Sequence, residues 1–232
     1  MTHSPDQIHV ARNGARNSGG TDRPLDDDLV AAVVAEVRDY GVRRATASSI
    51  ATRAGVSRVT LYRRGGSVRS LVLDALSAEF ARVLGEAAAT TSGVTARERL
   101  VDLCLRAVDV LAHDPLVEAL LRHDPELLLP YLVDRPGQSQ LNAARLIEAG
   151  LAAGHADASI RELDGHVAAT TILHALTPFV VSARLVESQA DVTAVHTELA
   201  TMLDGYLRPT GAPAPPETPR AHATARPARG TR

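Results

Sequence analysis

The stretch Thr46–Ser70, TASSIATRAGVSRVTLYRRGGSVRS, predicts two short helices joined by a tight turn. Thr46 is suited to cap the first helix, because its side-chain oxygen can accept a free backbone N–H of the first turn. Three apolar residues then share one face at helical spacing: Ile50, Ala51 and Ala54. Gly55 follows the last helical residue, where glycine adopts a left-handed conformation without strain. Val56 fills the corner, and Ser57 caps a second helix, Arg58–Arg64.

The second helix presents side chains that suit DNA. Arginine suits guanine edges and phosphates, hydroxyl groups suit phosphates, and a valine methyl suits the thymine methyl. The side chains expected on its outer face are Arg58, Val59, Thr60, Tyr62 and Arg63, whereas Leu61 is expected to point inward. A solvated helical hairpin would also present charged residues, but the paired caps and the helix–glycine–helix spacing favour a helix-turn-helix.

The charge around this stretch differs from that of the whole chain, whose net charge is −2. No Asp or Glu occurs from Gly41 to Leu73. The arginines in that interval are Arg43, Arg44, Arg53, Arg58, Arg63, Arg64 and Arg69. The stretch is therefore expected to form a cationic face that attracts a polyanion.

The run Ile50–Arg63 closely resembles the helix-turn-helix of TetR-type (tetracycline-repressor-like) regulators, in the pattern I-A-x-R-A-G-V-S-x-x-T-L-Y-R. The family pattern usually continues Tyr-x-His-Phe-x-Ser/Asn-Lys. This chain has Gly65 in place of the Phe and Val68 in place of the Lys, and Arg69 is the substitute for the missing lysine. The residues expected to contact DNA are Thr46, Ser57, Arg58, Val59, Thr60, Tyr62, Arg63, Arg64 and Arg69.

Composition narrows the class of protein further. The chain has 232 residues, 45% of them hydrophobic and 3% aromatic, which is enough for an aliphatic core in one or two domains. Its single cysteine, Cys104, excludes an internal disulfide and a cysteine-based zinc cluster. No apolar run approaches the ~20 residues of a membrane helix, and no signal peptide is recognisable, so we expect a cytoplasmic protein that engages no membrane.

The hydrophobic spacing predicts an all-α fold of about nine helices, with a three-helix DNA-binding head and a helical ligand-binding and dimerisation body. The expected helices outside the motif are Asp26–Tyr40, Ser67–Ala89, Thr95–Ala112, Leu116–Arg122, Glu126–Val133, Pro136–Gly154, Leu163–Glu187 with a kink at Pro178, and Asp191–Leu207. The expected divisions are a disordered arm (1–24), the DNA-binding domain (25–70, motif 46–65), the body (71–208) and a disordered Pro/Ala/Arg tail (209–232).

Motifs for chemistry are missing from the sequence. There is no G-x-S-x-G elbow, no phosphate-binding glycine loop and no dinucleotide fingerprint, so we expect no enzyme and no cofactor. Two His-Asp pairs could be read as metal ligands, His113-Asp114 and His123-Asp124. Each aspartate precedes a proline, however, and is expected to cap a helix instead. No metal site is therefore predicted. Cys104 is expected to be a small core residue, with a redox sensor as the alternative.

The family resemblance implies a homodimer that binds a near-palindromic operator and is released by a ligand, most plainly a repressor of transcription. The expected dimer contacts on the last two helices are Leu173, Leu176, Val180, Val195, Leu199, Met202 and Tyr206. The expected lining of a pocket for a small apolar effector is Leu103, Cys104, Ala107, Leu111, Leu120, Tyr131, Ile147, His174 and Phe179. The alternatives are a ligand-independent DNA-binding dimer without a pocket, and a protein-interaction dimer whose head no longer binds DNA specifically.

Overall fold

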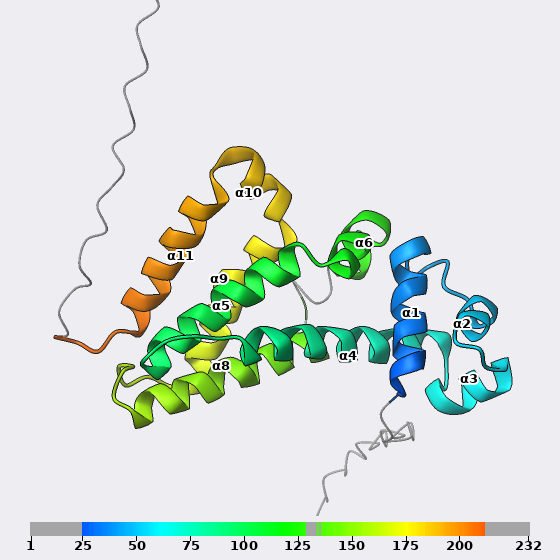
Figure 1. Cartoon of the computed structure of the whole chain (residues 1–232), viewed down its shortest axis with the longest axis horizontal. Helices are drawn as coiled ribbons and strands as arrows, with labels where there is room; N and C mark the ends of the chain where they lie inside the picture. The colour runs from blue at the N-terminus through cyan, green and yellow to red at the C-terminus, as the bar shows by residue number, and fades with distance from the viewer. Residues whose placement is uncertain (1–24, 129–133, 135, 212–232) are drawn as a thin grey trace, which may run out of the picture.

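The computed structural model describes residues 25–128, 134 and 136–211, and every regular element within them is helical (Figure 1). The all-α prediction is confirmed. The elements are α1 Asp27–Tyr40, α2 Ala47–Arg53, α3 Arg58–Gly65, α4 Val68–Ala89, α5 Ala96–Ala112, α6 Pro115–His123, the 3-10 turn η1 Pro125–Leu127, α8 Gln138–Ala156, α9 Gly165–Val181, α10 Ala183–Gln189 and α11 Val192–Leu207. The predicted arm, most of the predicted tail and Tyr131 lie outside the described residues.

Local capping accounts for where the first helices begin. The side chains of Asp26, Thr46, Ser57 and Ser67 each accept a backbone hydrogen bond from the residue three positions on, at the starts of α1 to α4. Such bonds satisfy N–H groups that have no partner inside the helix. The predicted caps of these helices are therefore confirmed.

Helices α1, α2 and α3 gather at one end of the molecule, which we call the head (Figure 1). Its core contains Val33, Val37, Ile50, Leu61 and Leu71, each with no exposed surface. The core also takes in residues from the first half of α4, and Leu116 and Leu120 from α6. The proposed domain division at residue 70 therefore crosses continuous packing.

The remaining helices form the body, in which α5 packs against α8, α9 and α11. Figure 1 shows α4 running out of the head and along the body. Body core residues include Leu100, Cys104, Leu151, Ile172 and Leu207, all at most 4% exposed. Burial also raises the pKa of the Cys104 thiol to about 12, which leaves the thiolate scarce at neutral pH.

Several helix ends differ from the predictions. Helix α8 begins at Gln138, after the predicted Pro136, and continues to Ala156 through Gly154, which packs directly on Ile160. The predicted helix Leu163–Glu187 is two helices. Pro178 is tolerated inside α9, and the chain breaks at Ser182, where α10 bends away by 71°.

One other predicted helix lies mostly outside the described residues. The expected helix Glu126–Val133 is represented by η1, and most of its remainder is outside the described residues. Among the helices that the structure describes, none has by itself the length and hydropathy to cross a membrane; only the bent pair α9 and α10, taken together, reaches that threshold.

Candidate nucleic-acid interface

Helices α2 and α3 form the helix-turn-helix that the sequence predicted. Helix α2 ends at Arg53, with Ala54 as its C-cap, and Gly55 follows with a φ of +64°, a left-handed conformation that favours glycine. The Val56 N–H then donates to the Ala51 carbonyl at 3.0 Å, which closes the turn before Ser57 caps α3. The turn thus positions α3 as the outer helix of the pair.

Helix α3 exposes the residues predicted for DNA contact. Val59 is 77% exposed and Tyr62 is 49% exposed, although both are apolar or aromatic, and Arg58 and Arg63 are exposed beside them. Leu61 is fully buried, which fixes the inward face. Thr60 is half-buried, and its hydroxyl lies 3.0 Å from the Ser57 hydroxyl. An exposed Val between two arginines fits contact with base edges in a groove.

The change at Gly65 has a structural counterpart in Leu71 of α4. Gly65 is buried, and a Cβ added there would lie 2.7 Å from Leu71 Cδ1 and 2.9 Å from Leu71 Cβ. The two helices therefore approach so closely that no side chain fits between them. Leu71 supplies the apolar support under α3 that a phenylalanine would otherwise give.

Ion pairing divides the head's arginines into two groups. Arg53 binds Glu36 at 3.2 Å and Asp39 at 2.7 Å, and Arg64 pairs with Asp26. Arg43 binds Glu126 at 2.7 Å. By contrast, the guanidinium groups of four exposed arginines have no acidic or hydrogen-bonding partner within the described part of the chain: Arg44, Arg58, Arg63 and Arg69.

This division changes two of the sequence-based expectations. Arg64, predicted to contact phosphate, pairs with Asp26 at the N-terminus of α1 and would have to leave that carboxylate to bind DNA. Arg44 was not among the predicted DNA contacts, although it is exposed and unpaired. The sequence does not distinguish Arg64 from Arg44, because Asp26 is 38 positions away from Arg64 and meets it only in the folded chain.

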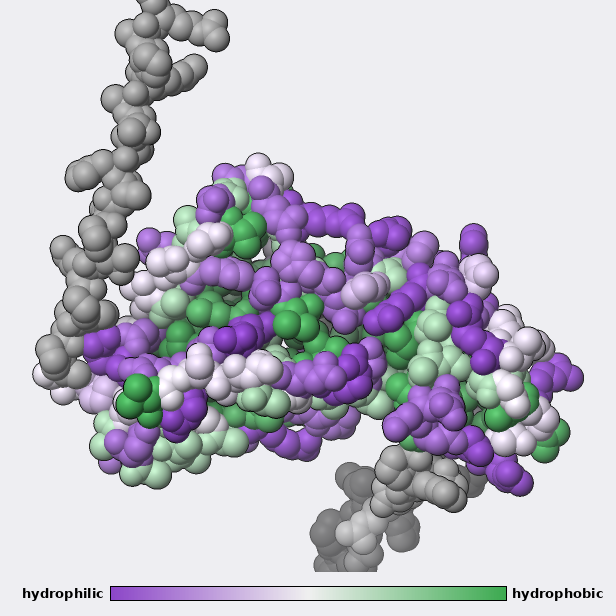
Figure 2. Space-filling view, in the orientation of Figure 1, coloured by the Kyte–Doolittle hydropathy of each residue, from purple (hydrophilic) through white to green (hydrophobic). Residues whose placement is uncertain are grey.

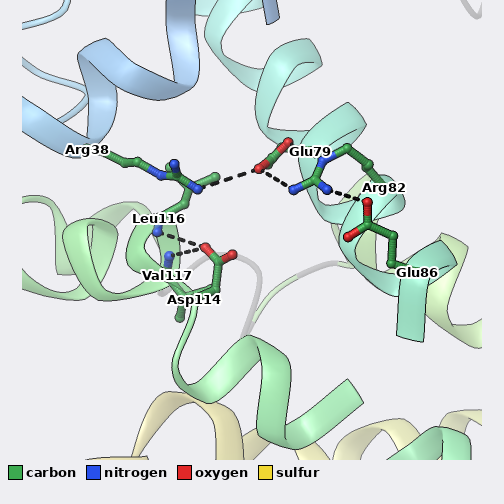
Figure 3. Close-up of polar contacts among 7 residues, drawn as sticks. All are labelled: Arg38, Glu79, Arg82, Glu86, Asp114, Leu116 and Val117. Atoms are coloured by element: carbon green, nitrogen blue, oxygen red, sulfur yellow. Dashed lines mark hydrogen bonds and ion pairs between the residues drawn. The ribbon is translucent and has the colours of Figure 1, made fainter. Parts of the chain in front are cut away.

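A polar network fixes the head to α4 (Figure 3). Glu79 of α4 is 8% exposed, and its carboxylate receives two bonds of 2.9 Å from Arg82 and lies 3.6 Å from Arg38 of α1. Arg82 also donates to Glu86 at 2.6 Å. Hydrogen bonding from Arg82, with Arg38 nearby, holds the pKa of Glu79 below its usual value.

Beside this network the buried Asp114 caps α6 through the Leu116 N–H at 2.7 Å and the Val117 N–H at 3.3 Å, as predicted.

The residues predicted to line an effector pocket do not meet in one cavity. Leu120 belongs to the head core, and His174 is exposed on α9 with its Nδ1 2.8 Å from the Thr170 carbonyl. Cys104 and Ile147 are buried in the body core, and Leu103 packs against that core. Ala107 and Leu111 are half-buried on α5. Tyr131 is outside the described residues. Helical spacing places residues on a face, but it does not show which faces meet.

A small crevice does lie beside one of those residues, Phe179. It measures about 20 Å³ and is bounded by α5, α9, α10 and α11. Its other lining residues are Val108, Ala112, His113, Ala183, Val186, Glu187, Val192, Val195 and His196. Helix α10 covers it without a buried residue of its own, and is held by His113–Glu187 at 3.2 Å and by Arg184–Glu118. Among the described residues no group of three metal-binding side chains occurs here or elsewhere.

The residues predicted for the dimer interface fall into two groups, buried and partly exposed. Leu176 is 7% exposed and Leu199 is 4% exposed, because both pack in the core of their own chain. Their assignment to an interface was therefore wrong. Leu173, Val180, Val195 and Tyr206 are half-buried against the same core, and Met202 is 49% exposed. Figure 2 shows hydrophilic side chains over much of the head, and both apolar and hydrophilic patches on the visible side of the body.

Comparisons with known proteins agree with this architecture. Uncharacterised HTH-type transcriptional regulators of Mycobacterium bovis and Mycobacterium tuberculosis are 35% identical to this chain over 179 residues, which covers 77% of it and 92% of each relative. No family model matches the chain.

Solved structures share the fold at lower identity. The transcriptional repressor QsdR of R. erythropolis, from the TetR family, matches with a TM-score of 0.57 and 20% identity, over 78% of this chain and 94% of its own. The fatty acid degradation regulator FadR of Bacillus halodurans matches with a TM-score of 0.57 and 21% identity, over 76% of this chain and 93% of its own.

Proposed function

Since the chain belongs to the TetR-type family of helix-turn-helix transcriptional regulators, we propose that it acts as a homodimeric repressor that binds a near-palindromic DNA operator and leaves it when an apolar effector binds. The observation that carries the proposal is the exposed face of α3. Two unpaired arginines there flank an exposed valine, with no acidic residue on the helix.

The proposal gives the exposed residues two kinds of role. Arg58 and Val59 face base edges, with Thr60 near them at the start of α3. Tyr62, Arg63 and Arg69 hold the head on phosphates, and Thr46 and Ser57 lie at the N-termini of α2 and α3, where backbone N–H groups attract anions. Base contacts supply sequence preference, and phosphate contacts supply affinity that depends on salt.

A dimer follows from the geometry of DNA. Recognition helices that read successive major-groove turns must be ~34 Å apart, and a rigid pairing of two chains provides that spacing. Exposed apolar residues on α9 and α11 support the pairing, since Val167 is 60% exposed and Met202 is 49% exposed. We place the interface on the outer faces of these two helices, with Met202 retained from the predicted set.

For the effector we propose entry beneath α10. The crevice there has mostly apolar walls, interrupted by His113, Glu187 and His196, and α10 rests on it through surface ion pairs and no buried side chain. A crevice of about 20 Å³ holds no more than one water, so α10 must move outward to admit a ligand. Complete release from DNA requires ~10⁴-fold tighter effector binding to the released state than to the DNA-bound state.

The same small volume favours a second candidate function, a DNA-binding dimer that needs no ligand. A thermal-shift screen of small apolar compounds separates the two candidates. The effector proposal expects a compound that raises the melting temperature and weakens DNA binding, whereas the second candidate expects none that does both.

Selection of bound sequences from random duplex DNA tests the main proposal. We expect enrichment of a near-palindromic site by the wild-type chain, and loss of enrichment by an Arg58→Ala, Arg63→Ala double variant. Wild-type protein that retains no duplex even at low salt would contradict it. Circular dichroism of the double variant is the control, because a folded variant shows that unfolding did not cause the loss of enrichment.

A further inference from the structure

The turn between α1 and α2 carries two neighbouring arginines with different surroundings. Arg43 Nη2 lies 2.7 Å from Glu126 Oε1, and its Nε lies 3.9 Å from Asp124 Oδ1. Arg44 is exposed, and its guanidinium has no partner among the residues that the structure describes. One arginine is therefore neutralised by the segment that follows α6, and its neighbour keeps a full charge.

Asp124, from the end of α6, holds the backbone of this turn. It is only 1% exposed, and its carboxylate accepts the Val42 N–H at 2.6 Å and the Arg43 N–H at 3.4 Å. The sequence predicted that Asp124 would cap the following helix, but its side chain makes no such bond at η1. A buried carboxylate needs hydrogen-bond partners, and here a turn 82 residues earlier provides them.

Gly41 makes this contact possible. Its φ is +82°, and an added Cβ would lie 2.6 Å from Asp124 Oδ2 and 2.8 Å from His123 Cβ. Helix α6 is also anchored in the head, since Leu116 and Leu120 are at most 3% exposed in its core. The end of α6 and the α1–α2 turn therefore form one packed unit.

We infer that Arg44 is a further DNA-positioning residue, which binds a backbone phosphate beside the bases read by α3, and that Asp124 positions it by holding the turn. The inference rests on the proposed DNA binding. Arg44 lies in the turn that leads into α2, the first helix of the helix-turn-helix. A charge without a partner among the described residues is available to a phosphate, whereas Arg43 would first have to leave Glu126.

The consequence is measurable without knowing the operator, because phosphate contacts are independent of sequence. Each phosphate contact contributes about 0.9 to the slope of log affinity against log salt concentration. A homodimer loses one contact from each chain, so the slope falls by about 1.8 and binding at ~0.1 M salt weakens about 60-fold. A random-sequence duplex of about 30 base pairs, long enough for two half-sites, is the probe.

The first experiment compares Arg44→Ala with Arg43→Ala, titrated with this duplex over a range of salt concentrations. Both side chains are exposed, so both variants are expected to fold. We expect Arg44→Ala to bind about 60-fold more weakly at ~0.1 M salt and to lose about 1.8 from the slope, while Arg43→Ala keeps the wild-type slope. Equal slopes for wild type and Arg44→Ala would overturn the inference, whereas absence of any binding by wild type would instead overturn the proposed function.

The second experiment tests the role of Asp124 by a double-mutant cycle. We expect Asp124→Asn to weaken duplex binding severalfold in the wild-type background and to have little effect in the Arg44→Ala background. A general loss of folded protein would lower affinity equally in both backgrounds, and that result would reject the positioning role. Hydrogen exchange of the wild-type Val42 and Arg43 amides needs no variant: bound duplex is expected to slow both, and unchanged rates would also reject it.

Discussion

Gly65 shows how one residue can decide the packing under a recognition helix. The common phenylalanine is missing from the sequence pattern, and the pattern alone does not reveal what replaces it. The structure supplies Leu71, which fills the space so closely that Gly65 has no room for a Cβ. The compensation is invisible in the sequence because it depends on the distance between α3 and α4.

Replacing Gly65 by Ala should destabilise the head. The new Cβ would lie 2.7 Å from Leu71 Cδ1, and overpacking of this kind typically costs about 1–3 kcal/mol. Gly85→Ala on α4 is the matched control, because its added Cβ meets nothing within 4 Å and should stabilise the helix by about 0.5–1 kcal/mol. Urea unfolding of both variants measures the difference, and similar free energies of unfolding for the two would refute this account of Gly65.

Glu79 gives a prediction about pH. Because hydrogen bonds from Arg82 lower its pKa in the folded chain, its contribution to stability is present above the ordinary value of 4.5 and is lost as pH falls through the lowered pKa. We expect Glu79→Gln to lower the free energy of unfolding by about 1.5–3 kcal/mol at neutral pH, the range for hydrogen bonds to charged groups. The gap in melting temperature between wild type and variant should shrink in acid. A gap that stays constant down to pH ~3 would show that the charge is not what stabilises this junction.

At the scale of single elements, helix identity was predictable wherever local signals agreed. Capping residues and apolar stripes place α1 to α6 and α11 close to their observed limits. Prediction was wrong for the end of α8, which continues through Gly154 to Ala156. It was also wrong where a distant contact decides, as for Asp124, which turns to the head instead of capping η1. Local patterns carry no information about such partners.

In the proposed complex, α3 is the element that reads the DNA sequence. We expect Arg58→Ala to lose about 1–3 kcal/mol of binding to a selected site and to relax preference at one base position, because a bidentate contact to guanine carries that discrimination. Arg69→Ala, at the start of α4, should weaken binding to all sequences alike and reduce the salt slope by about 1.8, about 0.9 from each chain of the dimer. Competition titrations with matched and mismatched duplexes distinguish the two. If Arg69→Ala changes neither affinity nor slope, its assignment to phosphate is wrong.

At the scale of the whole molecule, the head, the body and the long α4 that links them were predictable as a set of helices, but their surfaces were not. Leu176 and Leu199 repeat at the same spacing as exposed residues, yet they face the core of their own chain. Periodicity identifies an apolar stripe and cannot tell a core from an interface. The same ambiguity explains why the expected effector-lining residues are spread between head core, body core and surface.

The dimer can be tested through Met202, which is 49% exposed on α11. In a two-fold interface a Glu at this position is buried in both chains, so we expect Met202→Glu to weaken dimerisation by about 2 kcal/mol or more, roughly 30-fold. Val94→Glu, at a loop residue 91% exposed, is the control and should leave association unchanged. Sedimentation equilibrium measures both. Equal dissociation constants for the two variants would move the interface away from α11.

We propose above all that two copies of this chain bind one duplex through α3. Sedimentation velocity of the wild-type protein with a duplex obtained by selection, over increasing salt, tests it most directly. We expect a complex of two chains per duplex, in which the affinity of the protein for DNA falls steeply as the salt concentration rises. A chain that stays monomeric and free of DNA at low salt would contradict it.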